Sequence, residues 1–270
     1  MYKLLALDLD GTVLNSAHTI NPRLKQAIQT ISQTHHVMIV TGRHHVAAQP
    51  YHAELGLTTP IICCNGTYIY DYQAQQVLSE NSIDKANALK FIRLADQFKL
   101  KLVMYSRDSM LYSRQQPVMY MEKLLEWANS YPVEDRPSIV KVDSFIDALK
   151  DAEYIWKFVV EGNDLENFLQ TELVQAHFNG EQSWVDRFDF ANKGNSKGNA
   201  LSRYAADLKI DVKAMVAVGD NHNDISMLKL AGLGVAMGNA EPEVQQHAQL
   251  ITADNDDQDA LADLLLSTFS

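Results

Sequence analysis

The sequence predicts an α/β protein: a Rossmann-like core with a parallel sheet, interrupted by an inserted α+β cap domain. In the first and last thirds of the chain, short buried apolar segments alternate with amphipathic helical segments, the pattern of a right-handed parallel α/β sheet. The middle third carries several strand-like segments in succession, which is typical of α+β structure. We therefore expect the core in residues 1–81 and 188–270 and the cap in residues 82–187.

The first third alternates strands and helices. Residues 3–9 form a short apolar segment that ends at a glycine turn, as buried strands do. Asn21 followed by Pro22 predicts a helix start. Apolar residues then recur at helical spacing: Leu24, Ala27, Ile28 and Ile31. Residues 37–40 predict a second buried strand, a helix follows it, and residues 60–64 predict a third strand.

The middle of the chain changes pattern, and the end returns to the first one. A hairpin over residues 67–78 and a helix that begins at Asp84 come first. Strands are then expected at residues 101–105, 110–112, 138–142 and 154–160. A helix around Leu165, Phe168 and Leu169 and a strand pair near Trp184 and Phe188 follow. From Asn195 onward the expected order is a helix, a strand at 214–218, a helix at 225–231, strands at 233–236 and 249–251, and a closing helix.

Charge and composition exclude several classes of function. Lys and Arg number 23 and Asp and Glu 34, so the net charge is 23 − 34 = −11, which disfavours nucleic acid and anionic membranes as partners. No apolar run reaches the ~18 residues that a membrane span needs. Acids at Asp8 and Asp10 argue against a signal peptide, so we expect a cytoplasmic protein without an obligate protein partner. The adjacent Cys63 and Cys64 predict buried thiols in a strand.

Polar residues follow the predicted core strands at their carboxyl ends, where open α/β sheets bind ligands. The first strand is followed by Asp8, Asp10 and Thr12, and the second by Thr41, Gly42 and Arg43. The third is followed by Asn65 and Gly66, and the strand that ends at Val218 by the segment from Gly219 to Asp224. Lys197 opens a helix nearby in the chain.

These residue types together predict a phosphoryl site. Asp8, Asp10, Asp220 and Asp224 would bring up to four carboxylates together, and a divalent cation would relieve their repulsion. Oxygen ligands without a His or Cys cluster favour Mg²⁺ over zinc. Lys197, the Thr41 hydroxyl and the glycine amides would bind a tetrahedral anion, with a carboxylate placed to attack it.

Each motif alone also has a purely structural explanation. An Asp-x-Asp pair after a strand is often a turn, and Gly-Asp at a strand end is often a helix cap. Thr41-Gly42-Arg43 could cap a helix, and Lys197 could be a solvated helix residue. The conjunction of all four, in order along the chain, favours the functional interpretation.

The set Asp8-x-Asp10-x-Thr12, Thr41, Lys197 and Gly219-Asp220-x-x-x-Asp224 resembles the four motifs of the haloacid dehalogenase-like phosphatases. The spelling of residues 219–224, and the place of the insert after the third core strand, resemble the Cof-type branch. The segments 41–47, 62–68 and 195–198 are similar to the bacterial pyridoxal-phosphate phosphatases of that branch.

The resemblance implies a mechanism. Asp8 would form an aspartyl-phosphate, and Asp10 would protonate the leaving oxygen and then deprotonate water. The carboxylates of Asp8 and Asp220 and the backbone carbonyl of Asp10 would hold Mg²⁺, with Asp224 orienting the metal's ligands or Lys197. The residues implied to bind the phosphate oxygens are Thr41, Gly42, Lys197 and Asn223.

The predicted function is therefore a Mg²⁺-dependent phosphatase of small phosphorylated metabolites. Pyridoxal phosphate is the substrate that the resemblance suggests, with sugar phosphates or FMN as alternatives. A signalling module that only accepts a phosphoryl group is a second class, which the large insert and Asp10 disfavour; phosphotransfer to a second sugar is a third. His44 and His45 are interpreted as surface residues at a helix start, with contact of one of them with a substrate as the alternative, and His222 as a non-ligand.

Overall fold

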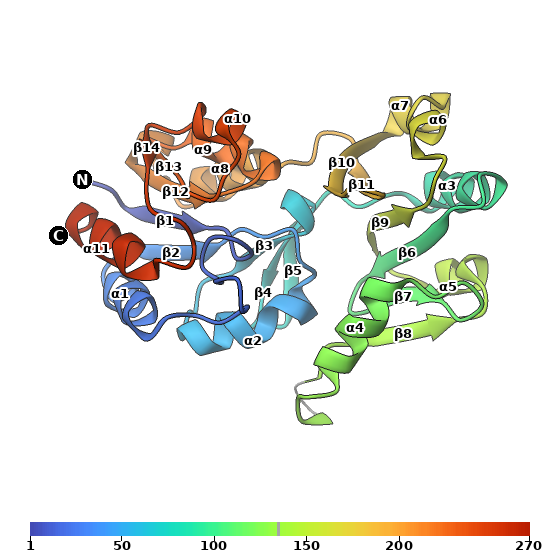
Figure 1. The fold of residues 1–270 in the computed structure, drawn as a ribbon, viewed down its shortest axis with the longest axis horizontal. Coiled ribbons are helices and arrows are strands. Elements are labelled where there is room, and N and C mark those ends of the chain that lie inside the picture. Colours follow the sequence, from blue (N-terminus) through green and yellow to red (C-terminus); the bar gives the residue numbers. More distant parts are fainter. Residues whose placement is uncertain (134–135) are drawn as a thin grey trace. The chain divides into compact units, whose positions relative to one another are not determined.

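The computed structural model describes residues 1–133 and 136–270 (Figure 1). Its contacts divide the chain into two compact units. The first contains residues 1–43, 48–79 and 196–270, and the second contains residues 44–47 and 80–195. Among the described residues, no helix has the length and apolar character that crossing a membrane requires.

A five-stranded sheet forms the centre of the first unit. Its strand order is β14-β13-β12-β1-β2, and every neighbouring pair is parallel. The strands are β1 (Leu4–Leu7), β2 (His36–Ile39), β12 (Met215–Gly219), β13 (Leu233–Ala236) and β14 (Leu250–Ile251). The predicted α/β class with a parallel core is confirmed.

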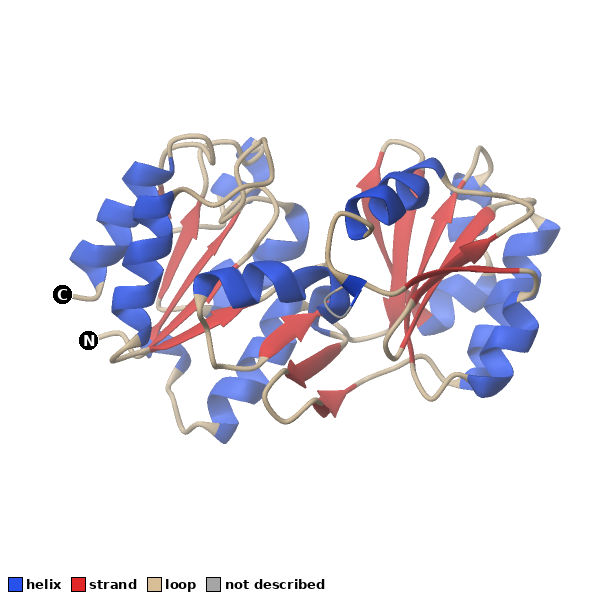
Figure 2. Cartoon of the chain, turned by 90° about the horizontal axis from the view of Figure 1, so that it is seen from below, coloured by secondary structure: helices blue, strands red, loops and turns tan. Residues whose placement is uncertain are grey.

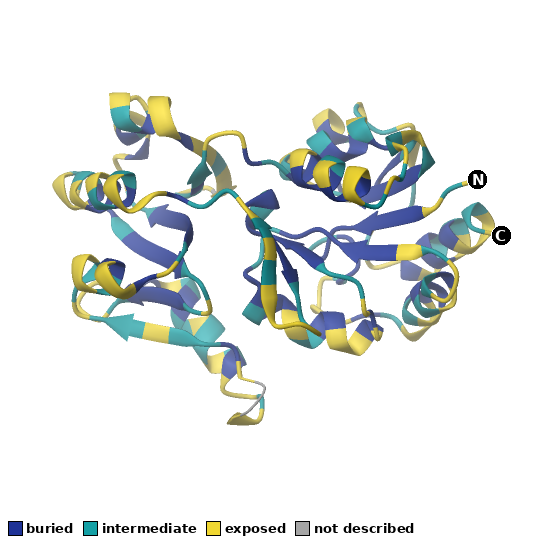
Figure 3. Ribbon diagram, turned by 180° about the vertical axis from the view of Figure 1, so that it is seen from behind, coloured by how far each residue is buried: buried dark blue, intermediate teal, exposed yellow. Residues whose placement is uncertain are grey.

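Helices cover this sheet on both sides. They are α1 (Pro22–Ser32), α8 (Lys197–Asp207), α9 (Ile225–Leu230), α10 (Pro242–Gln245) and α11 (Gln258–Thr268). α1 packs against α11, and in Figure 1 this pair lies on one side of the sheet and α8 and α9 on the other. Figure 2 shows helices on both sides of the strands. Leu4 and Ala6 face the side chains of α8 and α9, and all four residues of β1 are buried (Figure 3). Because successive side chains of a strand point to opposite faces of the sheet, β1 is buried on both faces.

The third predicted core strand pairs differently from expectation. β3 (Ile61–Cys63) lies in a separate sheet with β4 (Tyr68–Asp71) and β5 (Gln76–Glu80), and it is antiparallel to β4. A single parallel bridge between Val40 and Ile62 links it to the end of β2. The tight turn η1 (Cys64–Gly66) reverses the chain after β3, so β4 pairs with one edge of β3, while on the other side the carbonyl of Ile62 accepts from the N–H of Thr41 at 2.9 Å. The predicted hairpin after β3 is present.

The second unit has a six-stranded sheet of order β10-β11-β9-β6-β7-β8. Its strands are β6 (Lys101–Ser106), β7 (Met110–Ser113), β8 (Ile139–Val142), β9 (Ile155–Glu161), β10 (Phe178–Trp184) and β11 (Arg187–Asn192). All pairs are antiparallel except β7 with β8. Phe91 stacks on Phe158 in its apolar core, with ring centroids 4.6 Å apart.

The helices of the second unit were predicted incompletely. They are α3 (Lys85–Gln97), α4 (Met119–Ala128), α5 (Phe145–Asp151), α6 (Leu165–Leu169) and α7 (Glu172–His177), besides the first residues of α2 (His45–Leu55). The sequence analysis missed α4, α5 and α7. Val118, at the start of α4, makes no side-chain cap bond, so the usual start signal is missing.

The predicted boundary at residue 187 falls inside a strand. β11 pairs with β9 along Arg187–Ala191, so the structure groups residues 188–195 with the second unit. The division into a catalytic core and a cap with a separate role stays a prediction.

Candidate active site

The carboxyl ends of neighbouring parallel strands bring the predicted site residues together. β12, β1 and β2 are adjacent and parallel, so they end at the same edge of the sheet. Asp8 directly follows β1, Asp220 directly follows β12, and Thr41 comes two residues after β2. This is the edge at which the sequence predicts ligand binding.

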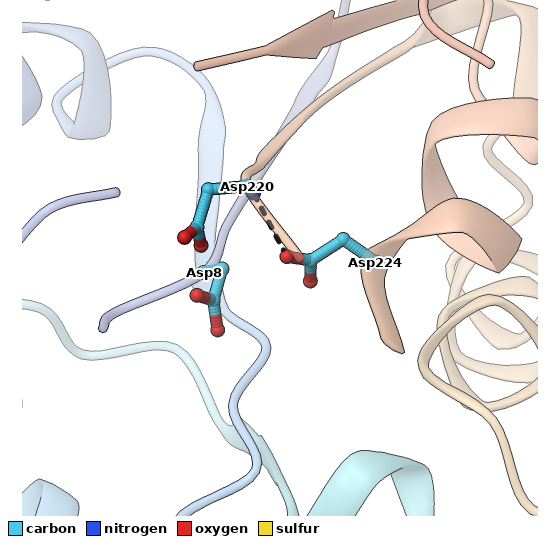
Figure 4. Close-up of side chains that lie close together, drawn as sticks. All are labelled: Asp8, Asp220 and Asp224. Atoms are coloured by element: carbon cyan, nitrogen blue, oxygen red, sulfur yellow. Dashed lines mark hydrogen bonds between the residues drawn. The ribbon is translucent and has the colours of Figure 1, made fainter. Parts of the chain in front are cut away.

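Three carboxylates form a cluster at this edge. Asp8, Asp220 and Asp224 each offer an oxygen, and these three atoms lie within 4.8 Å of one another. Figure 4 shows the three side chains, with the backbone of Asp220 hydrogen-bonded to the carboxylate of Asp224. Asp224 is fully buried and Asp8 is 5% exposed, so water screens their repulsion weakly.

The electrostatics of the cluster fit a divalent cation. Burial raises the pKa of Asp8 well above its usual value; Lys197 opposes this, and the other carboxylates add to it. Burial and the charge of Asp224 raise the pKa of Asp220 to about 7. Crowded carboxylates with raised pKa values are stabilised by a hard cation, and an all-oxygen donor set suits Mg²⁺. The residues present therefore fit the metal that the sequence predicts.

Lys197 is the fixed cation of the site. It is the first residue of α8 and fully buried, and its Nζ lies 2.6 Å from Asp8 Oδ1 and 2.6 Å from Asp224 Oδ1. Burial alone would lower the pKa of Lys197, but the charges of Asp224 and Asp8 outweigh it and raise the pKa. Lys197 is therefore an ammonium ion at neutral pH.

Asp224 has its hydrogen-bonding capacity largely occupied. Its Oδ1 accepts from Lys197, and its Oδ2 accepts from the backbone N–H of Asp220 at 2.9 Å and of Asn221 at 3.0 Å. These bonds hold the loop after β12 and the lysine in place. They agree with the orienting duty that the resemblance implies, and they leave Asp8 and Asp220 as the less occupied carboxylates.

Asp10 is held by an arginine. Arg43 Nε donates to Asp10 Oδ2 at 2.7 Å, and Arg43 Nη2 donates to Oδ1 at 2.5 Å. Burial raises the pKa of Asp10, but the hydrogen bonds and charge of Arg43 outweigh it and lower the pKa. The carboxylate is thus ionised in this conformation. Its side chain is 45% exposed, which also favours the charged form.

The predicted phosphate-binding residues lie on loops beside the cluster. Thr41 is buried, and its Oγ1 accepts from the backbone N–H of Arg43 at 3.1 Å, which leaves the hydroxyl proton for another acceptor. Gly42 follows it. In η4 (His222–Asp224), Asn223 Nδ2 donates to Asn65 Oδ1 at 3.0 Å, and Asn223 Oδ1 is a buried acceptor without a partner among the described residues.

The sequence analysis missed one residue that touches the cluster. Asn239 Nδ2 donates to Asp220 Oδ2 at 3.2 Å and to the carbonyl of Gly11 at 3.0 Å. Thr12 Oγ1 donates to the other Asp220 oxygen at 3.2 Å. Asn239 comes three residues after the carboxyl end of β13, so the strand-end criterion that selected Asp220 could have selected it too.

The histidine pair was wrongly predicted to be on the surface. His44 is fully buried and His45 is 3% exposed. Within the second unit, His44 Nε2 lies 2.8 Å from the Ser106 carbonyl, and His45 Nε2 lies 3.6 Å from Asp108 Oδ1. His222 is half exposed and lies 3.4 Å from Glu243, outside the carboxylate cluster.

A known protein family and several individual proteins resemble this chain along most of its length. The profile of the haloacid dehalogenase-like hydrolases matches residues 5–265. The chain is 38% identical over 269 residues to the Escherichia coli protein named pyridoxal phosphate phosphatase YbhA, covering 98% of each chain. It is 29% identical to the Bacillus subtilis phosphatase YwpJ, covering 94% of this chain and 96% of the relative.

Solved structures show the same architecture. A haloacid dehalogenase-like hydrolase from Bacteroides thetaiotaomicron superposes with a TM-score of 0.85 at 26% identity, covering 99% of this chain and 100% of the other. A second one, from B. subtilis, gives a TM-score of 0.82 at 25% identity over 97% of this chain and 98% of its own.

Proposed function

The chain belongs to the haloacid dehalogenase-like hydrolases and is a phosphatase, and we propose that it hydrolyses small phosphorylated metabolites through an aspartyl-phosphate on Asp8, with Mg²⁺. The observation that carries this proposal is the buried contact of Lys197 Nζ with Asp8 Oδ1, at 2.6 Å, beside the carboxylate cluster. A buried ammonium beside a carboxylate at a sheet's carboxyl edge suits attack on a phosphoryl group, because it balances the charge there.

Asp8 and Asp220, with the backbone carbonyl of Asp10, would hold the metal. When bound, Mg²⁺ would lower the repulsion between the Asp8 carboxylate and the phosphate anion. The remaining groups place the substrate: the Thr41 hydroxyl, the Gly42 amide, Lys197 and the Asn223 amide would donate to the phosphate oxygens. Asp224 would keep Lys197 in register through the bond between them.

The chemistry divides into two steps. An Asp8 oxygen bonds to phosphorus while the bond from phosphorus to the ester oxygen breaks, and Asp10 in its protonated form gives that oxygen a proton. Asp10, now a carboxylate, then takes a proton from water as the water oxygen attacks phosphorus. The bond from phosphorus to Asp8 breaks, phosphate leaves, and Asp8 and protonated Asp10 are regenerated.

Pyridoxal phosphate is the proposed substrate. The support is the 38% identical relative, whose name is that of a pyridoxal phosphate phosphatase, and whose similarity extends over nearly the whole of both chains. We also propose that the enzyme works in the cytoplasm without an obligate protein partner. The buried thiols of Cys63 and Cys64 suit a reducing compartment.

A substrate panel tests the substrate class. Phosphate release with Mg²⁺ is measured for pyridoxal phosphate, FMN and a set of hexose phosphates. We expect the highest kcat/KM for pyridoxal phosphate. A higher kcat/KM for a hexose phosphate or for FMN would overturn the assignment of pyridoxal phosphate as the substrate, but not the assignment of the protein as a phosphatase.

Trapping the intermediate tests the mechanism. With p-nitrophenyl phosphate the leaving oxygen needs little help from an acid, so Asp10→Ala should still form the aspartyl-phosphate but hydrolyse it slowly. Acid-quenched protein from that variant should carry a phosphoryl group on the peptide that contains Asp8. The double variant Asp8→Asn with Asp10→Ala should carry none; label on another peptide would contradict the assignment.

A further inference from the structure

The backbone of the turn after β3 is strained, and the proposed mechanism gives this turn no role. Cys64, Asn65 and Gly66 have φ angles of 49°, 56° and 89° in succession. The left-handed region costs a non-glycine residue free energy, and asparagine bears that cost better than most. Such strain persists where the surrounding structure determines it, and it is common at functional sites.

The backbone of this turn holds the loop that contains Thr41 and Gly42. The N–H of Asn65 donates to the Thr41 carbonyl at 3.1 Å, and the N–H of Cys64 donates to the Arg43 carbonyl at 3.0 Å. The turn thus directs two successive backbone amides at the same loop. The turn therefore fixes the backbone on either side of Gly42.

The side chain of Asn65 extends the contact to a second loop. Its Oδ1 accepts from Asn223 Nδ2 at 3.0 Å. The same oxygen would lie 2.9 Å from a Cβ at position 42, so the carboxamide packs against Gly42 and leaves no room for a side chain there. Asn65 thus connects two of the residues proposed to bind phosphate.

We propose that Asn65 is a positioning residue that orients the amide of Asn223 for phosphate; this rests on the proposed function. The Asn65 oxygen takes one of the two Nδ2 hydrogens of Asn223, which leaves the other for a phosphate oxygen. Were the carboxamide of Asn223 to flip, its Oδ1 would face the anion instead, and acceptor would meet acceptor. The Asn65 bond selects the donating orientation before substrate arrives.

Glycine is the informative replacement at position 65. Asn65→Ala would add strain at a φ of 56° and could unfold the turn, whereas Asn65→Gly keeps this φ accessible and removes only the carboxamide. Gln75 offers a matched control. It has a φ of 52°, is exposed, and lies in the turn between β4 and β5. Gln75→Gly makes the same kind of backbone change away from the proposed phosphate residues.

The experiment compares Asn65→Gly, Asn223→Ala, the double variant and Gln75→Gly with the parent. Binding of inorganic phosphate with Mg²⁺ is measured by calorimetry, beside KM, kcat and the Tm. We expect Asn65→Gly and Asn223→Ala each to weaken phosphate binding about tenfold, the loss of one hydrogen bond to a charged group. The double variant should bind as weakly as Asn223→Ala alone, because Asn65 acts through Asn223. Gln75→Gly should bind like the parent.

Two outcomes overturn the positioning role: parent-like phosphate binding in Asn65→Gly, or losses that multiply fully in the double variant. A lower Tm in Asn65→Gly with unchanged phosphate binding would mean a structural duty alone. Failure of the proposed function is recognised separately, because the unmutated protein would then release no phosphate in a Mg²⁺-dependent way. Parent-like phosphate binding in Asn223→Ala would show that Asn223 does not bind phosphate, and this would also overturn the role of Asn65.

Discussion

Arg43 and Asp10 form a two-point ion pair, with N–O distances of 2.7 Å and 2.5 Å, at the edge of the sheet where the chemistry is proposed. The pair holds Asp10 as a carboxylate, yet the first chemical step needs Asp10 protonated. Arg43 therefore opposes the acid form of Asp10 and favours the base form that the second step needs.

Replacing Arg43 should move the pH profile. In Arg43→Gln the pKa of Asp10 rises, because the hydrogen bonds and charge that lower it are gone. The acid form then persists to higher pH, so the basic limb of the kcat/KM profile should shift upward. Steady-state rates across the pH range check this. An unshifted basic limb would mean that another group is the acid.

Asp8→Asn should abolish turnover. The substitution removes the nucleophilic charge and a proposed metal ligand together, so kcat should fall by several orders of magnitude while the circular dichroism spectrum stays that of the parent. Activity within tenfold of the parent, only about 1.4 kcal/mol of barrier, is too small an effect for a nucleophile.

Metal removal should be reversible and depend on pH. EDTA should abolish activity, Mg²⁺ should restore it, and Ca²⁺ should inhibit because its looser coordination misplaces the ligands. Protons compete with the metal for Asp220, whose pKa is about 7. The apparent affinity for Mg²⁺ should therefore weaken as pH falls below that value. Full activity after exhaustive chelation would remove the metal from the mechanism.

The buried His44 should make the fold sensitive to acid. Burial and the neighbouring His45 lower the pKa of His44, so below about pH 6.5 the unfolded chain binds a proton that the folded protein does not. The resulting stability is present above that pH and is lost as the pH falls toward the lowered pKa, at about 1.4 kcal/mol per pH unit. His44→Gln should flatten the decrease in urea-unfolding free energy between pH 7.5 and 5.5. Equal slopes in parent and variant would contradict it.

Gly66 and Gly194 form a matched pair, because both have a φ of 89°. A Cβ at position 66 would lie 2.2 Å from the carbonyl of Ser196, the residue that caps α8 before Lys197, whereas a Cβ at 194 meets no atom within 4 Å. Gly194→Ala should cost only the backbone strain, about 1–2 kcal/mol. Gly66→Ala should cost more in thermal unfolding and also lower kcat, because α8 must shift. Equal losses of stability in the two variants would show that α8 shifts without a free-energy cost.

Much of the site could be predicted from the sequence, because the signals that locate it lie within short segments of the chain. A short apolar run predicts a buried parallel strand, and the polar residues after it lie at that strand's carboxyl end whatever surrounds them. Asp8, Thr41 and Asp220 were found in this way. The helix α4 was not, because no capping side chain marks its start and its place against a sheet depends on distant strands.

The sequence by itself determined which chemical groups stand at which strand ends, and hence the phosphatase class. Tertiary structure alone decided how those groups act on one another. Lys197 meets Asp8 across 189 positions of chain, and Arg43 reaches Asp10 from the loop after the neighbouring strand β2. Hydrogen bonds and pKa shifts depend on distance and burial, which are properties of the folded arrangement. The same holds for the proposed duty of Asn65, whose contact with Asn223 spans 158 positions of chain, since local sequence does not specify long-range contacts.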